Sequence, residues 1–335
     1  MIPLEKNQHL KSKDISQLLK EHYANIMPSF YEMQSTFLTG IYKRYQSIES
    51  GNILLCFSKN MHLEIIRQRE KNLNFDVSLE NFWKNFNEVT KPVEKISSVV
   101  NITGIPKETV RRKIKNLLNI EFLSENKMLK GYCWHLTSKT KDPYLDIINK
   151  EIKSLSKFIS KFANILNLNL TIKTIEKEIQ GQFSFYWYHF LSCELEWLKM
   201  WQTKLKDNDL LLIALQAIIP TLQFEEKKIE KIKVDEIFKI IGKINSPKAN
   251  DTYMINASTV SDVTGIPRAT CIRKLEKLVS LGFLVREVKS KRYFVNQSTD
   301  ARTKNILNKD NVTFTIEKFS EYFAIILNSL RHNRL

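Results

Sequence analysis

The sequence predicts a mainly α-helical chain with small β-hairpins, in which one arrangement of elements occurs twice. Apolar residues recur at the three- and four-residue spacing of amphipathic helices along much of the 335 residues. The tetrapeptide Thr-Gly-Ile-Pro occurs at 103–106 and again at 264–267, each time before a basic helical pattern. Since the chain holds only eight glycines and eight prolines, a turn repeated in the same setting indicates a duplicated unit.

Alignment of the chain with itself defines the two repeats. At an offset of 161 positions, 103–132 and 264–293 share 12 identities in 30, and 157–167 matches 318–328 without a gap, with 7 in 11. We therefore predict two repeats that meet near residue 168. The first is 1–168, with a turn-and-hairpin region at about 92–138 and an amphipathic helix at about 150–167; the second is 169–335, with the corresponding regions at about 252–298 and 313–330. The stretch NSPKAND at 245–251 is a predicted loop.

Helical apolar stripes predict the core of each repeat. They run along 53–65 and 211–219, and along the two matched amphipathic helices. An aromatic stretch, FSFYWYHFLSCELEWLKMW at 183–201, is typical of core, with the lining of a small-molecule effector pocket as the alternative.

The net charge of +16 indicates an anionic partner. It is divided between the repeats, with 26 basic against 17 acidic residues in 1–168 and 26 against 19 in 169–335. Nucleic acid is the first expectation and an acidic membrane surface the second. Because the longest apolar run, 210–219, is about half the length of a bilayer span, we expect no membrane segment.

Catalytic and metal-site motifs are absent from the sequence. The four cysteines and six histidines are scattered, and no phosphate-binding loop, Gly-x-Ser-x-Gly or His-Glu-x-x-His pattern occurs. Scattered cysteines are typical of reduced packing residues, and no signal peptide is evident. We therefore predict a cytoplasmic protein that is not an enzyme and needs no cofactor or metal.

The repeated tetrapeptide predicts a helix, a tight turn and a second helix. Gly104 suits the left-handed position that closes a helix, and Pro106 suits the start of the next one. After the turn, an apolar face recurs in both copies: Val110, Ile114, Leu117 and Leu118, then Cys271, Leu275, Leu278 and Val279. The opposite face is formed by Lys107, Glu108, Arg111, Arg112 and Lys115, or by Arg268, Ala269, Ile272, Arg273 and Glu276.

A hairpin with a basic tip is predicted after each second helix. Two short β-prone runs flank a polar turn that carries Lys127 and Lys130 in the first copy. The corresponding turn carries Lys289, Lys291 and Arg292 in the second. A helix-turn-helix followed by such a hairpin is the layout of a winged helix, which places its second turn-linked helix in the major groove of DNA.

The second copy, SDVTGIPRATCIRKLEKLVSLGFLVRE, resembles the winged helix-turn-helix of bacterial transcriptional regulators of the MarR and GntR-like kind. The resemblance covers about 40 residues in each repeat and implies duplex DNA as the partner. In the first copy, Lys107-Glu108 replaces Arg268-Ala269, and Glu121 occupies the place of Gly282, which provides the bend before the wing.

These observations predict a regulator that reads two unlike DNA half-sites with two winged helices in one chain. The predicted DNA-binding residues are Lys107, Thr109, Arg111, Arg112, Lys115, Lys127, Lys130, Arg268, Thr270, Arg273, Lys289, Lys291 and Arg292. A plasmid-type replication initiator, and a scaffold that uses winged helices for protein contacts, are the alternatives. A small-molecule effector and a homodimer are left open.

The two predicted recognition segments differ in charge. The first, 101–116, carries Lys107, Arg111, Arg112, Lys113 and Lys115 against Glu108, a charge of +4. The second, 262–277, carries Arg268, Arg273, Lys274 and Lys277 against Asp262 and Glu276, a charge of +2. We expect stronger attraction to the DNA backbone in the first copy, and more room for Arg268 to reach a guanine edge in the second.

Overall fold

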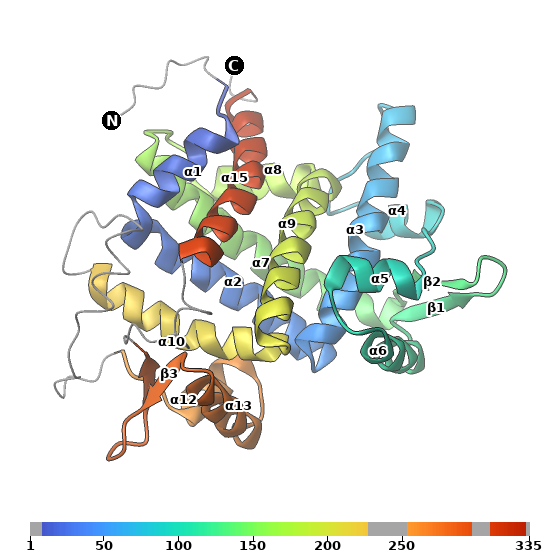
Figure 1. Cartoon of the computed structure of the whole chain (residues 1–335). Helices are drawn as coiled ribbons and strands as arrows, with labels where there is room; N and C mark the ends of the chain where they lie inside the picture. Colours follow the sequence, from blue (N-terminus) through green and yellow to red (C-terminus); the bar gives the residue numbers. More distant parts are fainter. Residues whose placement is uncertain (1–8, 227–252, 297–308, 333–335) are drawn as a thin grey trace. The chain divides into compact units, whose positions relative to one another are not determined.

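The computed structural model describes 9–226, 253–296 and 309–332, and these ranges are mainly helical (Figure 1). Their strands form two antiparallel two-stranded hairpins, β1–β2 and β3–β4. The prediction of a mainly α-helical chain with small hairpins is therefore confirmed. The predicted loop at 245–251 lies outside the described residues, as do the outer ends of the predicted 252–298 region.

The elements follow the same order in both predicted repeats, except that the helix Phe82–Glu88 of the first has no counterpart among the described residues of the second. The first contains α1 (Ser12–Glu21), α2 (Tyr23–Tyr45), α3 (Ile48–Lys71), α4 (Phe82–Glu88), α5 (Ile96–Thr103), α6 (Lys107–Asn119), β1 (Leu123–Asn126), β2 (Gly131–Trp134) and α7 (Ser138–Ile165). The second contains α8 (Ile172–Gly181), α9 (Phe183–Leu205), α10 (Asn208–Glu226), α12 (Ala257–Thr264), α13 (Arg268–Ser280), β3 (Leu284–Arg286), β4 (Tyr293–Val295) and α15 (Lys309–His332).

Four pairs of matched helices have equal lengths, whereas α3 and α10 have 24 and 19 residues and α7 and α15 have 28 and 24. α1 and α8 have 10 residues each, and α2 and α9 have 23. The helices before the repeated turn, α5 and α12, have 8 residues, and those after it, α6 and α13, have 13. The common pattern of lengths extends the relation between the two halves to α1–α2 and α8–α9, where the sequence match is weak.

The compact units of the molecule do not coincide with the predicted repeats. One unit, here called the α2/α10 unit, comprises Met1–Gln46 and Asp207–Ile325. The other, the α3/α9 unit, comprises Ser47–Lys206 and Ile326–Leu335. Each unit thus combines the first two helices of one repeat with the later elements of the other.

The α2/α10 unit is built on a pair of long helices. α2 packs along α10, and α12 contacts both of them (Figure 1). Gln216 of α10 donates a hydrogen bond to the Ser35 hydroxyl of α2 over 2.9 Å. In the core, the Phe30 ring meets the edge of Phe319 at a centroid distance of 4.9 Å.

The α3/α9 unit has the corresponding pair. α3 packs along α9, α5 contacts both, and α7 packs against α8. The aromatic stretch at 183–201 lies in α9, where five of its large side chains are at most 2% exposed: Phe183, Tyr186, Trp187, Phe190 and Trp197. These side chains fill the core of the unit, which was the first expectation for that stretch.

Two further sequence expectations concern the packing of the chain. All four cysteines are buried and carry free thiols. Among the described helices, none combines the length and the apolar character that a bilayer crossing requires.

Candidate nucleic-acid interface

The predicted DNA-binding residues lie in two structural modules. The first module consists of α5, α6, β1 and β2, within the α3/α9 unit. The second consists of α12, α13, β3 and β4, within the α2/α10 unit. Both have the order helix, turn, helix, hairpin.

Each residue of the Thr-Gly-Ile-Pro turn has a separate structural role. Gly104 and Gly265 end their helices with φ of 68° and 76°, in the left-handed region that glycine tolerates best. The proline precedes the first residue of the next helix, with φ of −56° at Pro106 and −54° at Pro267. The expected helix closure by glycine is confirmed in both copies.

The threonine and isoleucine of the turn have roles that the sequence did not predict. In the first copy, the buried Thr103 hydroxyl donates to the Val99 carbonyl over 2.8 Å and accepts from the Ile105 amide over 3.2 Å. Thr264 makes the same two bonds, to Val260 and Ile266. Ile105 and Ile266 are fully buried. The turn is therefore held by a side-chain bridge and an apolar anchor as well as by its backbone.

The helices after the turn are amphipathic as predicted. Val110, Ile114 and Leu117 of α6 are buried, and so are Cys271, Leu275 and Leu278 of α13. Leu118 and Val279, expected on the same face, are only half-buried. Burial raises the pKa of the Cys271 thiol, which keeps it a neutral packing group.

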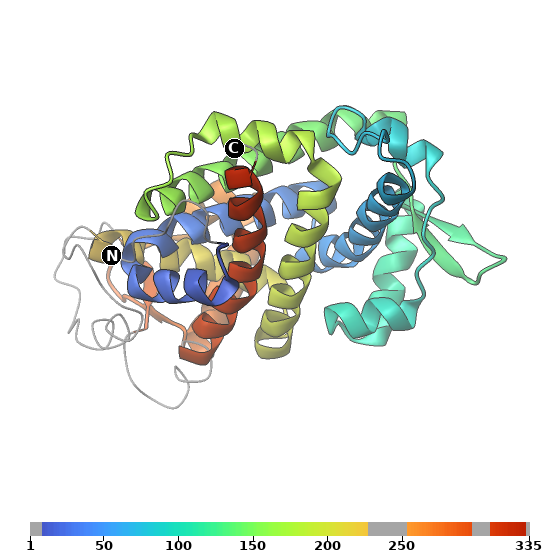
Figure 2. The same ribbon diagram turned by 90° about the horizontal axis from the view of Figure 1, so that it is seen from above.

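Each hairpin is joined to its module by a third segment of chain. Glu94 and Tyr132 exchange two backbone hydrogen bonds of 2.8 and 2.9 Å, and so do Ile255 and Tyr293. In the first hairpin, Asn126 pairs with Gly131, which leaves 127–130 as the tip. The β1–β2 hairpin extends away from the helices of its unit, as both views show (Figure 1 and Figure 2).

Most of the predicted binding residues are exposed. The exposed side chains are Lys107, Arg111, Arg112, Lys115, Lys127, Lys130, Arg268, Arg273, Lys289 and Lys291. Thr109, Thr270 and Arg292 are half-buried. Each module therefore exposes basic residues both on its second helix and at its hairpin tip.

Two lysines counted in the recognition segments point inward instead. Lys274 is 8% exposed, and its Nζ lies 2.6 Å from Asp207 Oδ2 and 3.2 Å from Asp209 Oδ2. The matching Lys113 donates to the Ser47 hydroxyl over 2.8 Å, with Glu49 at 3.7 Å. Each lysine ties the second helix of its module to the start of the long helix beneath it. Both lysines were counted in the expected charges of the recognition segments, but neither is free to contact a ligand.

Acidic residues of the two helices also differ in role. Glu108 lies on the exposed face of α6 and holds the Arg111 guanidinium at 3.0 Å. Glu276 of α13 instead accepts from Arg286 over 2.9 Å and from the Tyr293 hydroxyl over 2.7 Å. Burial first, and the bond to Glu276 second, raise the pKa of Tyr293 to about 12. Glu276 thus links α13 to its hairpin, and its charge is paired with Arg286.

Exposed apolar side chains are concentrated on the modules, a feature that was not predicted from the sequence. The large apolar residues that are exposed among the described residues are Leu73, Ile120, Met128, Leu129, Ile172, Val263, Ile272 and Val288. All except Leu73 and Ile172 lie within the two modules. Apolar exposure beside basic residues is typical of a surface that contacts another molecule.

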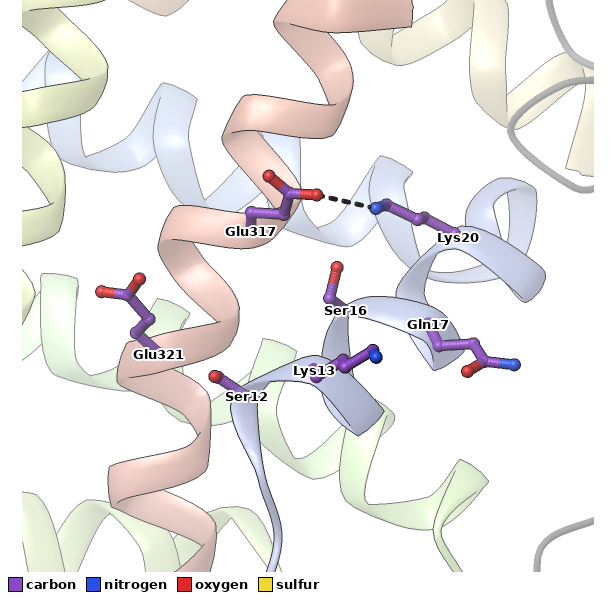
Figure 3. A pocket seen from close by; sticks show the side chains of 7 residues that line it. All are labelled: Ser12, Lys13, Ser16, Gln17, Lys20, Glu317 and Glu321. Atoms are coloured by element: carbon purple, nitrogen blue, oxygen red, sulfur yellow. Dashed lines mark hydrogen bonds and ion pairs between the residues drawn. The ribbon is translucent and has the colours of Figure 1, made fainter.

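A separate polar hollow lies in the α2/α10 unit, between α1 and α15 (Figure 3). It has a volume of about 510 Å³ and is lined by Ser12, Lys13, Ser16, Gln17, Lys20, Glu317 and Glu321. Lys20 and Glu317 pair across it at 3.0 Å. Its lining residues include charged side chains of both signs and no aromatic one, so it does not match the aromatic effector pocket considered from the sequence.

Comparison with known proteins identifies no relative of the chain, since neither known protein families, nor curated proteins, nor solved structures show a match to it. Within the described residues, no three histidine, cysteine or acidic side chains gather in a way that could hold a metal ion.

Proposed function

We propose that the chain is a sequence-specific, double-stranded DNA-binding regulator of transcription, in which each module is a winged helix. In this proposal, α6 and α13 enter the major groove, and the hairpins contact the flanking backbone or minor groove. The carrying observation is that one arrangement occurs twice: a glycine-closed turn, a helix with a buried apolar back and a basic front, and a hairpin with a lysine-bearing tip.

The electrostatics of the modules support DNA over a neutral partner. Arginine and lysine at exposed positions neutralise phosphates and release counterions, which makes affinity depend on salt. Lys113 and Lys274 are excluded from this role because they are engaged inside their units. The remaining exposed cations of the two modules could contact roughly 6 to 10 phosphates.

A titration of the full-length chain with random-sequence duplex at several salt concentrations tests the proposal. We expect a slope of log affinity against log salt of about −5 to −9. Replacement of Lys150 and Lys153, exposed lysines of α7 outside the modules, by glutamine serves as a control for general surface charge. That control should leave the slope within about one unit of the wild type.

The location of the protein on its own genome then separates the kinds of DNA function. Sites next to promoters support a regulator, and repeated sites beside a replication origin would identify a replication initiator instead. If the chain fails to bind duplex at micromolar concentration and low salt, the DNA proposal is wrong and protein contact becomes the better interpretation of the modules.

A further inference from the structure

The tip of the first hairpin combines apolar exposure with flanking charge. Met128 is 85% exposed and Leu129 is 52% exposed. The residues on either side, Lys127 and Lys130, are exposed as well. The tip therefore presents two adjacent apolar side chains between two cations.

This tip is held in a defined conformation. The Asn126 side chain accepts a hydrogen bond from the Leu129 amide over 2.9 Å, and Lys130 adopts a left-handed φ of 50°. At its base, a Cβ on Gly131 would lie 2.8 Å from the Glu94 carbonyl oxygen, so the hairpin packs tightly on the third segment. The apolar side chains are thus carried on a braced turn.

The second hairpin has a related but weaker tip. Val288 is 86% exposed and is followed by Lys289, Ser290 and Lys291. Backbone and side-chain hydrogen bonds from Ser290, with a backbone bond from Lys289, lower the pKa of the Glu287 carboxyl, which closes this turn. The second tip therefore exposes one small apolar residue, whereas the first tip exposes two larger ones.

We propose that the Met128–Leu129 tip acts as an apolar wedge that enters the minor groove of duplex DNA and opens a base step. This inference rests on the proposed DNA-binding function. Methionine and leucine are among the side chains that unstack base steps from the minor groove, and such wedges kink the duplex by about 20° to 90°. The flanking lysines suit the phosphates that border the groove, which favours DNA over an apolar protein partner as the occupant.

Ring closure of short duplexes tests whether the tip bends DNA. Duplexes of about 100 base pairs are shorter than the persistence length of about 150 base pairs, so they close slowly unless a protein kinks them. We expect the full-length protein to raise the closure rate by about tenfold. Met128→Ser combined with Leu129→Ser should lower that enhancement at least about threefold, while affinity for linear duplex stays within about threefold.

Two control variants separate the wedge from charge and from general surface change. Lys127→Gln with Lys130→Gln should reduce the salt slope by about one to two units yet keep the ring-closure enhancement at saturating protein. Leu73→Ser replaces another strongly exposed leucine, 77% exposed and outside the modules, and should leave both properties unchanged.

The outcomes distinguish the wedge from the underlying DNA function. If the wild-type protein shows the salt-dependent affinity but does not speed ring closure, the wedge is wrong and DNA binding stands. The same conclusion follows if the double serine variant bends DNA as well as the wild type. Failure of the wild type to bind duplex would overturn the proposed function itself.

Discussion

The bend before each hairpin requires a left-handed residue, and the two modules supply it differently. Glu121 has a φ of 60° and Gly282 a φ of 76°. The substitution of glutamate for glycine, which set the first copy apart in sequence, therefore leaves the bend in place. For a residue with a Cβ this conformation costs about 1–2 kcal/mol, whereas glycine loses about 0.5–1 kcal/mol of extra chain entropy when it is ordered.

Substitutions at the two bends should change the free energy of unfolding in opposite directions. Glu121→Gly should raise the free energy of unfolding by roughly 0.5–1 kcal/mol, because the strain of the glutamate backbone disappears. Gly282→Ala should lower it by about 1 kcal/mol or more. Urea unfolding of both variants measures the effect, and a destabilised Glu121→Gly protein would show that the glutamate side chain has a role that outweighs the strain.

Burial of His62 predicts a pH dependence of stability. The ring stacks on Phe82 at 5.0 Å and meets Phe183 edge-on at 5.1 Å, and neither nitrogen has a hydrogen-bond partner among the described residues. This burial lowers the pKa of His62 from 6.5 to about 3. The unfolded chain therefore binds a proton near pH 6.5 that the folded chain accepts only near pH 3.

Stability should consequently be complete above about pH 6.5 and fall as the pH decreases toward 3, by on the order of 1 kcal/mol per pH unit from this group. His62→Leu, which fills similar space without a titrating group, should flatten that part of the profile. The measurement is the difference in unfolding free energy between the wild type and the variant at about pH 7.5 and at about pH 5. Parallel profiles for the two proteins would contradict the assignment.

At the scale of elements, the parts of the modules that local chemistry dictates could be predicted from sequence. The helix break at Gly104 and Gly265 follows from backbone sterics, and the buried faces of α6 and α13 follow from helical spacing. The inward course of Lys113 and Lys274 could not be predicted, because it depends on Ser47, Glu49, Asp207 and Asp209, which approach only in the folded chain. One signal was present: both lysines occupy the same position of the repeat, one residue before an apolar residue of the buried face.

The ion pair of Lys274 should stabilise its module more than that of Lys113. Lys274 contacts two carboxylates and its side chain is 10% exposed, whereas Lys113 is 21% exposed and lies 3.7 Å from Glu49. Lys274→Met leaves two partly buried carboxylates without their cation, which should cost roughly 1–3 kcal/mol. Lys113→Met should cost less than about 1 kcal/mol. Denaturant unfolding measures both variants. If they lose equal amounts of unfolding free energy, the differences in geometry and exposure do not set the strength of the two ion pairs.

For the whole molecule, the sequence could not reveal how the repeats are divided between the compact units. α2 is followed by α3 but packs on α10, and α9 is followed by α10 but packs on α3. Because α3 and α10 occupy equivalent places in the two repeats, a helix pattern that fits one of them also fits the other. The spacing and type of the residues therefore predict which face of a helix is buried. They do not predict whether the helix packs against a helix of its own repeat or of the other one. Each module consequently depends on helices from both halves of the chain.

Two modules with unlike outer faces predict a division of labour in DNA binding. α6 presents Lys107, Arg112 and Lys115 together with Arg111, whose pairing with the exposed Glu108 is screened by solvent. α13 presents Arg268 next to the small Ala269, with the Arg268 Nε bonded to the Ser258 hydroxyl over 3.0 Å. A charge-rich face favours the DNA backbone, whereas an arginine with space around it favours a guanine edge.

Removal of these arginines should therefore have different consequences. Arg111→Ala with Arg112→Ala should weaken binding to all duplex sequences and reduce the salt slope by roughly one unit for each phosphate that is no longer neutralised. Arg268→Ala should cost about 1–3 kcal/mol at the preferred site, with little effect on random duplex, and should relax the sequence preference of one half-site. Binding titrations with a site selected from randomised duplexes, and with random duplex, measure both effects. If Arg268→Ala lowered affinity equally for the two kinds of DNA, with both half-sites still protected in a footprint, Arg268 would be a backbone-binding residue and the modules would share one role.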